Sequence, residues 1–211
     1  MNLRFLIILI TLFNLIIGCQ KNHHVINVKA TNIVTDEPYE GLKISVVQQT
    51  PGVFESKYKN VYEGFLDANG ETTFDLIMKN NKSYQLGIEL PENTEYFNDL
   101  YFSLKHDQEI QNVTVDFAPK AYLKFRYFNS SCFDSDDSIR VERISQVDDY
   151  VGFIYPAIYY GCEDYTMDNY AEVVMGWWHF EWSVTKNGTT NYFSDSIYLN
   201  EGECKFYEFI Y

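Results

Sequence analysis

Residues 61–76 read VYEGFLDANGETTFDL, and this stretch decides the fold. Apolar and polar residues alternate on both sides of Asn69-Gly70, which is the pattern of two short half-buried strands. Asn and Gly both tolerate the positive φ angles that a tight hairpin turn demands. The stretch therefore predicts a β-hairpin that turns at residues 67–70.

The same alternation continues along the chain on both sides of this hairpin. Residues 26–31 and 42–47 alternate before it, separated by a turn rich in Pro and Gly, and residues 83–90 and 113–117 alternate after it. No stretch after the first eighteen residues has a convincing helical period. The sequence therefore predicts an all-β protein.

Residues 27–47, 61–76 and 83–90 together resemble the transthyretin-like or carboxypeptidase-regulatory-like β-sandwich repeat. The resemblance rests on an opening strand, a Pro/Gly turn into a G-x-x-x-x-V strand, a D-x-N-G hairpin and a closing Y-x-L strand. It covers residues 25–117 and implies the fold only. Members of this family serve as structural, adhesive or binding modules.

A second set of alternating segments begins after Ala118-Pro119, which we interpret as a domain boundary. Residues 121–127 alternate strictly, and Lys186-Asn187-Gly188 is another hairpin signal. Residues 119–211 thus predict a second sandwich, immunoglobulin-like or transthyretin-like, in tandem with the first, and both are expected to be antiparallel. Its further strands are expected near residues 139–144, 151–160, 171–185, 191–199 and 204–211.

Residues 1–18 predict a secretory signal and no part of the fold. After Arg4 comes an apolar run too short for a permanent transmembrane helix, which needs about 20 residues. The run ends in LIIGC, which resembles the lipobox of bacterial lipoproteins of the Bacteroidetes type. The resemblance implies cleavage before Cys19, a covalent lipid on its thiol, and residues 19–24 as a tether. An ordinary secretory peptide is the alternative.

The expected location is the cell envelope, with the lipid of Cys19 in the outer membrane. The protein could face either the periplasm or the cell surface. The chain carries 16 Lys and Arg against 30 Asp and Glu, a formal net charge of −14. Nucleic-acid binding needs a stripe of Lys and Arg, and no such cluster is visible along the sequence. The expected partners are therefore the membrane, other envelope proteins or glycans, and not nucleic acid.

Three cysteines follow Cys19, and all lie in the second half of the chain. An extracytoplasmic location permits one disulfide among Cys132, Cys162 and Cys204. We favour the pair Cys132 and Cys162, because each borders a polar, turn-like segment. A zinc site is the alternative, but the chain has no CxxC or HxxxH spacing and only His179 lies nearby.

Catalytic motifs are missing from the sequence, and we predict no enzyme activity and no cofactor other than the lipid. There is no GxSxG, HExxH, P-loop or GxGxxG pattern. Residues 67–71 do not begin an EF-hand, because the twelfth position is Met78. The acidic residues Asp134, Asp136 and Asp137 are calcium candidates, although we favour solvated acidic loops for this cluster.

Aromatic residues are dense in the second domain, and Tyr or Trp on an outward face would form a platform for sugar rings or for a partner protein. The alternative is that they fill a small core between two sheets. The candidate binding aromatics are Tyr155, Tyr159, Tyr160, Trp177 and Trp178.

Three functions fit these observations. The leading one is a non-catalytic, membrane-anchored envelope lipoprotein that binds or scaffolds a partner. The first alternative is a fimbrillin-like pilus or adhesin subunit, also made as a lipoprotein precursor. Such subunits are trimmed after an Arg, and no Arg occurs between Cys19 and Arg126. The second alternative is a glycan-binding lipoprotein of an outer-membrane uptake system, which requires exposed coplanar aromatics.

Overall fold

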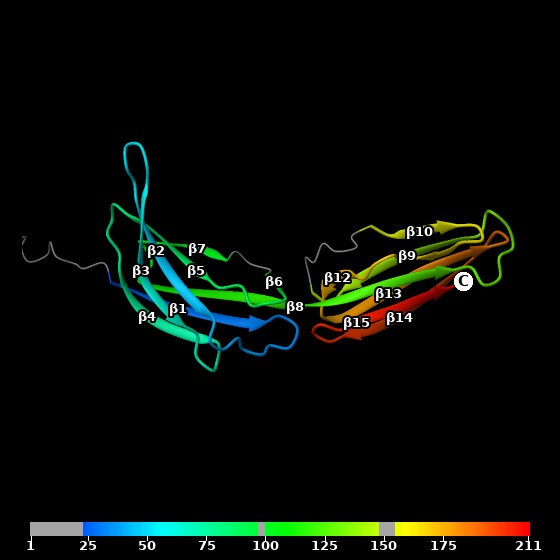
Figure 1. The fold of residues 1–211 in the computed structure, drawn as a ribbon, viewed down its shortest axis with the longest axis horizontal. Coiled ribbons are helices and arrows are strands. Elements are labelled where there is room, and N and C mark those ends of the chain that lie inside the picture. Colours follow the sequence, from blue (N-terminus) through cyan, green and yellow to red (C-terminus); the bar gives the residue numbers. More distant parts are fainter. Residues whose placement is uncertain (1–22, 97–99, 148–154) are drawn as a thin grey trace, which may run out of the picture.

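The computed structural model describes residues 23–96, 100–147 and 155–211 (Figure 1). These residues form β-strands and turns, without a helix among them, which confirms the all-β prediction. In these ranges no helix is long and apolar enough to span a membrane. The predicted signal peptide and Cys19 lie outside the described residues.

The first sandwich packs two sheets around a core drawn from residues 26–117. One sheet contains β4 (Glu71–Ile77), β1 (His23–Asn32), β8 (Ile110–Phe128) and β6 (Thr94–Tyr96). The other contains β3 (Lys57–Phe65), β2 (Lys43–Thr50), β5 (Ser83–Ile88) and β7 (Tyr101–Leu104).

The second sandwich has its own core, drawn from residues 118–211. One of its sheets is built on the second half of β8, which pairs with β11 (Asp164–Thr166), β12 (Ala171–Val174) and β15 (Cys204–Ile210). The other sheet has the order β10 (Ala157–Tyr160), β9 (Ser138–Ser145), β13 (Gly176–Lys186) and β14 (Thr189–Leu199). The two sandwiches lie end to end (Figure 1).

Strand β8 belongs to both sandwiches and runs straight through the expected boundary at Ala118-Pro119. Its odd-numbered residues are buried from Gln111 to Tyr127, so one face of one strand serves both cores. Pro119 has no N–H to donate, and it lies at the point where the strands that pair with β8 change. Strand β1 pairs with β8 as far as Phe117, and the Pro119 carbonyl accepts from Met175 N at 2.8 Å, just after β12.

Two strand pairings differ from the antiparallel prediction. Strand β1 runs parallel to the first half of β8, and β15 runs parallel to the second half. Local alternation does not reveal these pairings, because the paired strands are far apart in the sequence. In both cases the chain between the two strands passes through the opposite sheet. The remaining pairings are antiparallel.

The single strand expected over residues 171–185 is in fact two strands in two different sheets. Strand β12 pairs with β8, whereas β13 pairs with β9 and β14. Between them Gly176 has φ of +104°, a conformation that side-chain-bearing residues rarely adopt. A Cβ at Gly176 would lie 3.1 Å from Val34 Cγ1 and from Gln146 Oε1, so the crossing is closely packed.

The turn predicted at residues 67–70 is present between β3 and β4, but the predicted β-hairpin is wrong. Strand β3 pairs with β2 and strand β4 pairs with β1, so this turn carries the chain from one sheet of the sandwich to the other. Asp67 Oδ1 accepts hydrogen bonds from Asn69 N and Glu71 N, both at 2.9 Å. These bonds stabilise the carboxylate and hold the pKa of Asp67 below its ordinary value. Gly70 has φ of +68°, and its carbonyl accepts from Ala30 N at 2.9 Å, which fixes the turn against β1.

We expect Gly70→Ala to destabilise the protein by about 2–4 kcal/mol, because it adds a clash to the cost of a left-handed conformation. The new Cβ would lie 2.5 Å from the Ala30 carbonyl oxygen. Gly188→Ala is the matched control, since Gly188 has φ of +72° and open space around it. Urea unfolding of both variants separates the clash from the conformational cost; equal losses would contradict the prediction.

Candidate binding face of the second domain

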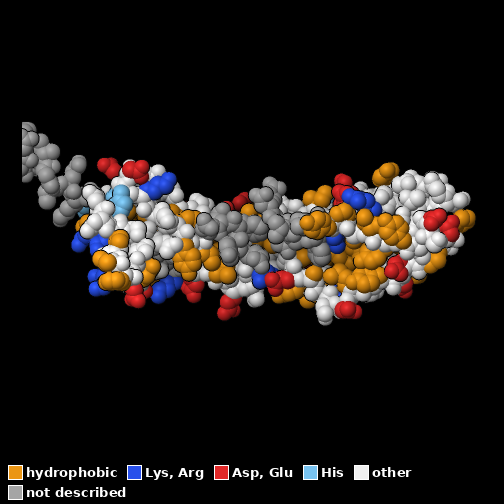
Figure 2. Space-filling view, turned by 90° about the horizontal axis from the view of Figure 1, so that it is seen from above, with side chains coloured by type: hydrophobic (Ala, Val, Ile, Leu, Met, Phe, Trp, Pro, Cys, Tyr) orange, Lys and Arg blue, Asp and Glu red, His pale blue; other side chains and the backbone are white. Residues whose placement is uncertain are grey.

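The outward side chains of the sheet β10-β9-β13-β14 form the surface that we call the binding face. Alternation along β13 buries Trp178, Phe180 and Val184 and leaves Trp177, His179 and Glu181 exposed. The same alternation on β9 exposes Arg140 and Glu142 while Ile139 and Val141 are buried. Seen from above, this half of the molecule shows hydrophobic, acidic and basic side chains side by side (Figure 2).

A hollow of about 570 Å³ lies on the binding face over the middle of β9, β13 and β14. Its outward side chains are Arg140, Glu142, Glu181, Ser183, Tyr192 and Ser194. Trp182 and Phe193 also line it, but their rings stack on each other on the core side of the sheet, 5.6 Å apart. The outward side chains of the hollow are therefore polar except for Tyr192, and Phe193 at its margin is also 48% exposed.

The charged groups of the hollow are fixed by strand register. Glu181 lies directly opposite Glu142 on the neighbouring strand, and Ser183 lies opposite Arg140. Residues in such positions have Cβ atoms about 5 Å apart, so the two carboxylates are neighbours. Arg140 forms an ion pair with Glu142 at 3.0 Å. Glu181 forms no ion pair among the described residues, and this leaves an acceptor facing the hollow.

A second aromatic cluster lies further along the same face, at the start of β13. Trp177 and Tyr198 pair across β13 and β14, and their rings meet edge to face with centroids 5.4 Å apart. Next along the strands, His179 Nδ1 and Ser196 Oγ are joined by a hydrogen bond of 2.7 Å. Six residues of β13 separate Trp177 from Ser183, the partner of Tyr192, which corresponds to roughly 20 Å.

The buried side of the sheet holds this face in place. Trp178 is fully buried and donates from Nε1 to the Val174 carbonyl at 3.0 Å. Strand β14 is tied to the opposite sheet by Tyr207 OH, which donates to Asp195 Oδ2 at 2.5 Å. This bond lowers the pKa of Asp195, and burial together with the same bond raises the pKa of Tyr207.

The predicted binding aromatics do not form one platform. Trp178 was placed wrongly among them, because alternation turns it into the core beside Phe180. Tyr159 is partly buried, with its ring centroid 4.4 Å from that of Tyr127. The remaining three, Tyr155, Tyr160 and Trp177, are exposed, but Tyr160 and Trp177 lie at opposite ends of the sheet.

The binding face contains residues that sequence reasoning did not select: Arg140, Glu142, Glu181 and Tyr192. Each sits at an outward position of an alternating strand, so its direction was readable from the sequence. Their proximity depends on the register of β9 against β13 and of β13 against β14. The register of β13 against β14 follows from the predicted turn at Asn187-Gly188. The register of β9 against β13 brings together residues some 40 positions apart, for which the sequence has no local signal.

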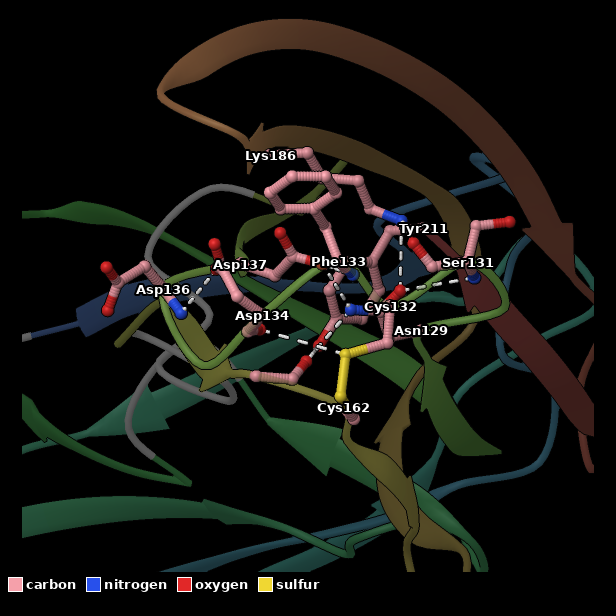
Figure 3. Close-up of a disulfide and its surroundings, with 11 residues drawn as sticks. Asn129, Ser131, Cys132, Phe133, Asp134, Asp136, Asp137, Cys162, Lys186 and Tyr211 are labelled. Carbon is pink, nitrogen blue, oxygen red and sulfur yellow. Dashed lines mark hydrogen bonds between the residues drawn. A yellow bond between two sulfur atoms is a disulfide. The ribbon is translucent and has the colours of Figure 1, made fainter.

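A disulfide joins Cys132 to Cys162 at the far end of the second domain, with their Cα atoms 5.1 Å apart (Figure 3). Cys204 is a free, exposed thiol on β15. The bridge connects the loop after β8 to the segment between β10 and β11. It closes a loop of the second sandwich that contains β9 and the hollow's Arg140 and Glu142.

Beside the disulfide, the calcium candidates have separate positions. Asp137 is fully buried, and its Oδ2 accepts from Phe133 N at 2.8 Å and from Asn129 Nδ2 at 3.0 Å (Figure 3). Asp134 and Asp136 are exposed, and Asp134 Oδ1 accepts from Asp136 N at 2.9 Å. Within the described ranges no group of three or more His, Cys, Asp or Glu residues is placed to hold a metal ion.

Because of Asp137, the free energy of unfolding should fall as the pH is lowered into the acid range. Hydrogen bonds from Phe133 N and Asn129, together with the nearby Lys186, hold the pKa of the buried carboxyl below its ordinary value. A lowered folded-state pKa stabilises the protein at neutral pH, and this contribution is lost as pH falls through roughly 4 and below.

We therefore expect Asp137→Asn to lower the free energy of unfolding at pH 7 and to flatten its decline between about pH 5 and pH 3. Urea unfolding across this range measures both effects. Asp136→Asn is the control and should stay within about 0.5 kcal/mol of the parent, since Asp136 is exposed. An unchanged acid slope in Asp137→Asn would contradict the assignment.

No protein-family model matches this chain, and no curated protein matches its sequence. Among solved structures, the Bacillus anthracis TIE protein is 11% identical with a TM-score of 0.35, covering 90% of this chain and 34% of that one. A streptococcal ancillary pilin is 10% identical with a TM-score of 0.34, covering 89% and 62%. The shaft pilin spaA from Lactobacillus rhamnosus GG is 8% identical with a TM-score of 0.33, covering 89% and 96%.

This chain thus spans about a third of the first of these proteins and less than two thirds of the second. All three likenesses have TM-scores below 0.4 and identities near 10%. They therefore carry no conclusion about what this chain binds or assembles with.

Proposed function

We propose that this protein is a non-catalytic, lipid-anchored envelope protein that works as an adhesin-type binding module. The lipid on Cys19 holds the first sandwich at the outer membrane, and the second sandwich binds an extended glycan on its binding face. The observation that carries the proposal is strand β8. Because 19 residues of one strand belong to both sandwiches, they form a single stalk whose shared strand is roughly 60 Å long.

The binding face suits a carbohydrate chain. Glu181 and Glu142 offer acceptors for hydroxyl groups, Arg140 offers donors, and Tyr192 offers an exposed ring on which a sugar can stack. The second cluster of Trp177 and Tyr198, roughly 20 Å away, would contact a later sugar of the same chain. An extended ligand therefore fits this face better than a single small molecule.

A glycan array probed with residues 20–211 tests the binding function. We expect binding of a polymeric glycan, and a Kd about tenfold higher for Trp177→Ala and for Tyr192→Ala, which corresponds to about 1.4 kcal/mol. Tyr101→Ala is the control, since Tyr101 is 65% exposed in the first domain. Turnover of a glycan, or equal affinity in all variants, would reject the proposal.

The anchor has a separate test. Cells expressing the full chain and fed labelled palmitate should incorporate label into this protein, and Cys19→Ala should abolish it. The Cys19→Ala chain should also leave the membrane fraction, because a covalent lipid adds about 0.8 kcal/mol of membrane affinity per buried CH₂ group. Labelled Cys19→Ala protein would show that Cys19 is not the site.

A pilus-type subunit is the second candidate, and one observation favours it. Among the described strands β14 pairs only with β13, so its other edge is open over eleven residues. An open edge can accept a strand from a neighbouring copy. Polymers of this chain in sheared surface fractions would support this candidate. Monomers alone would argue against it and favour the binding module.

A further inference from the structure

The hairpin between β2 and β3 carries an apolar tip that nothing in the described chain covers. Val53 is 93% exposed and Phe54 is 98% exposed. The hairpin projects from the body of the first domain as a separate arm (Figure 1). Its base is held by Gln49 Nε2, which donates to Ser56 Oγ at 3.0 Å and to Tyr58 OH at 3.3 Å.

The arm leaves the domain at the end where β1 begins. Lys82 Nζ donates to Thr50 Oγ1 at 2.7 Å, and the Lys82 carbonyl is hydrogen-bonded to His106 Nε2 at 2.7 Å. The His106 ring lies 6.4 Å from the ring of His24, at the start of β1. Cys19 is four residues before His23, and four residues span at most about 14 Å, so the proposed lipid anchor would be tethered close to this end.

Five lysines gather at the same end, from three segments of the chain: Lys57, Lys59, Lys79, Lys82 and Lys105. All but Lys82 are exposed, and none of the five forms an ion pair with a described residue. Basic, acidic and hydrophobic side chains are all visible at this end (Figure 2).

The acidic residues of this end are Glu55, Asp75, Asp107 and Glu109. The five lysines outnumber them, whereas the whole chain has a net charge of −14. The sequence did not reveal this basic cluster, because its members lie between residues 57 and 105 and only the fold brings them together.

We propose that this end, which we call the membrane-facing end, docks on an anionic phospholipid surface, with Val53 and Phe54 inserted between the headgroups. The inference rests on the proposed anchor, which places a bilayer beside this end. Lysines near a membrane are attracted by anionic lipids, and exposed aromatic residues partition into the interface. A lipid alone would leave the stalk free to pivot, and these contacts fix its orientation.

Cosedimentation with vesicles tests the proposal without the covalent lipid. Residues 20–211 retain every described strand and should bind vesicles of phosphatidylcholine with 30% phosphatidylglycerol, and bind pure phosphatidylcholine far less. Val53→Ser with Phe54→Ser should reduce the partition coefficient about tenfold, and Lys57→Gln with Lys59→Gln by a similar factor at low salt. Only the lysine effect should vanish at high salt.

The matched control is Phe206→Ser with Ile210→Ser, an exposed apolar pair on β15. This variant should bind as the parent does, and melting curves confirm that each variant is folded. The proposal is overturned if the parent does not bind anionic vesicles, or if the tip and control variants lose binding equally. Palmitate labelling of the full chain reports on the anchor alone, so failure of one idea is distinguishable from failure of the other.

Discussion

Trp178→Ala should lower the free energy of unfolding by about 3–5 kcal/mol, the largest effect we expect from a single substitution. Trp178 is fully buried within the core of the second sandwich. Its loss leaves a large cavity and removes the hydrogen bond from Nε1 to the Val174 carbonyl. Urea unfolding followed by circular dichroism measures the change.

The neighbouring residue is the matched control for this prediction. Trp177 has the same side chain and is 45% exposed on the other face of β13. Trp177→Ala should cost less than about 1 kcal/mol and should weaken ligand binding. Equal destabilisation by the two substitutions would mean that the faces of β13 are wrongly assigned.

Removal of the disulfide should have the second largest effect. Cys132→Ser with Cys162→Ser frees a loop whose ends are 30 residues apart. Loop-closure entropy for that length corresponds to about 3–4 kcal/mol of stability. Thermal unfolding of the double variant should therefore occur well below that of the parent, and the parent should shift in the same way in the presence of a reductant.

Cys204→Ser is the control for the disulfide, since Cys204 is exposed and unpaired. It should leave stability within about 0.5 kcal/mol of the parent. A large loss in Cys204→Ser, together with a small loss in the double variant, would assign the bridge to a different pair.

Local patterns in the sequence were sufficient for most of the strands but not for their partners, and they did not reveal the break between β12 and β13. Asn187-Gly188 correctly predicted the hairpin of β13 and β14, whereas Asn69-Gly70 predicted a turn but not the sheet change that follows it. Alternation placed Trp178 on the same face as Phe180, which already indicated that it is buried. Ala118-Pro119 indicated a domain boundary, although strand β8 continues through it. The reason is that a strand tolerates a missing N–H where its neighbours change, and that depends on long-range pairing.

The candidate site was harder to predict than the fold for the same reason. Arg140 and Glu181 become neighbours only through the register of β9 and β13. The lysines of the membrane-facing end become neighbours only through the packing of β3 against the β4–β5 turn and the end of β7. Consecutive aromatic residues such as Trp177 and Trp178 invite a functional reading, but alternation requires them to take opposite faces.

The parallel pairing of β1 with β8 has a mechanical consequence. If the lipid holds the start of β1 while a ligand pulls the second domain, the load enters β1 at His23 and leaves β8 beyond Phe117. The two strands are then pulled lengthwise in opposite directions. The register from Val25 opposite Ile110 to Asn32 opposite Phe117 means that their hydrogen bonds bear this shear together and do not open one at a time. We expect the stalk to resist tension best along the axis that joins its anchor to its ligand.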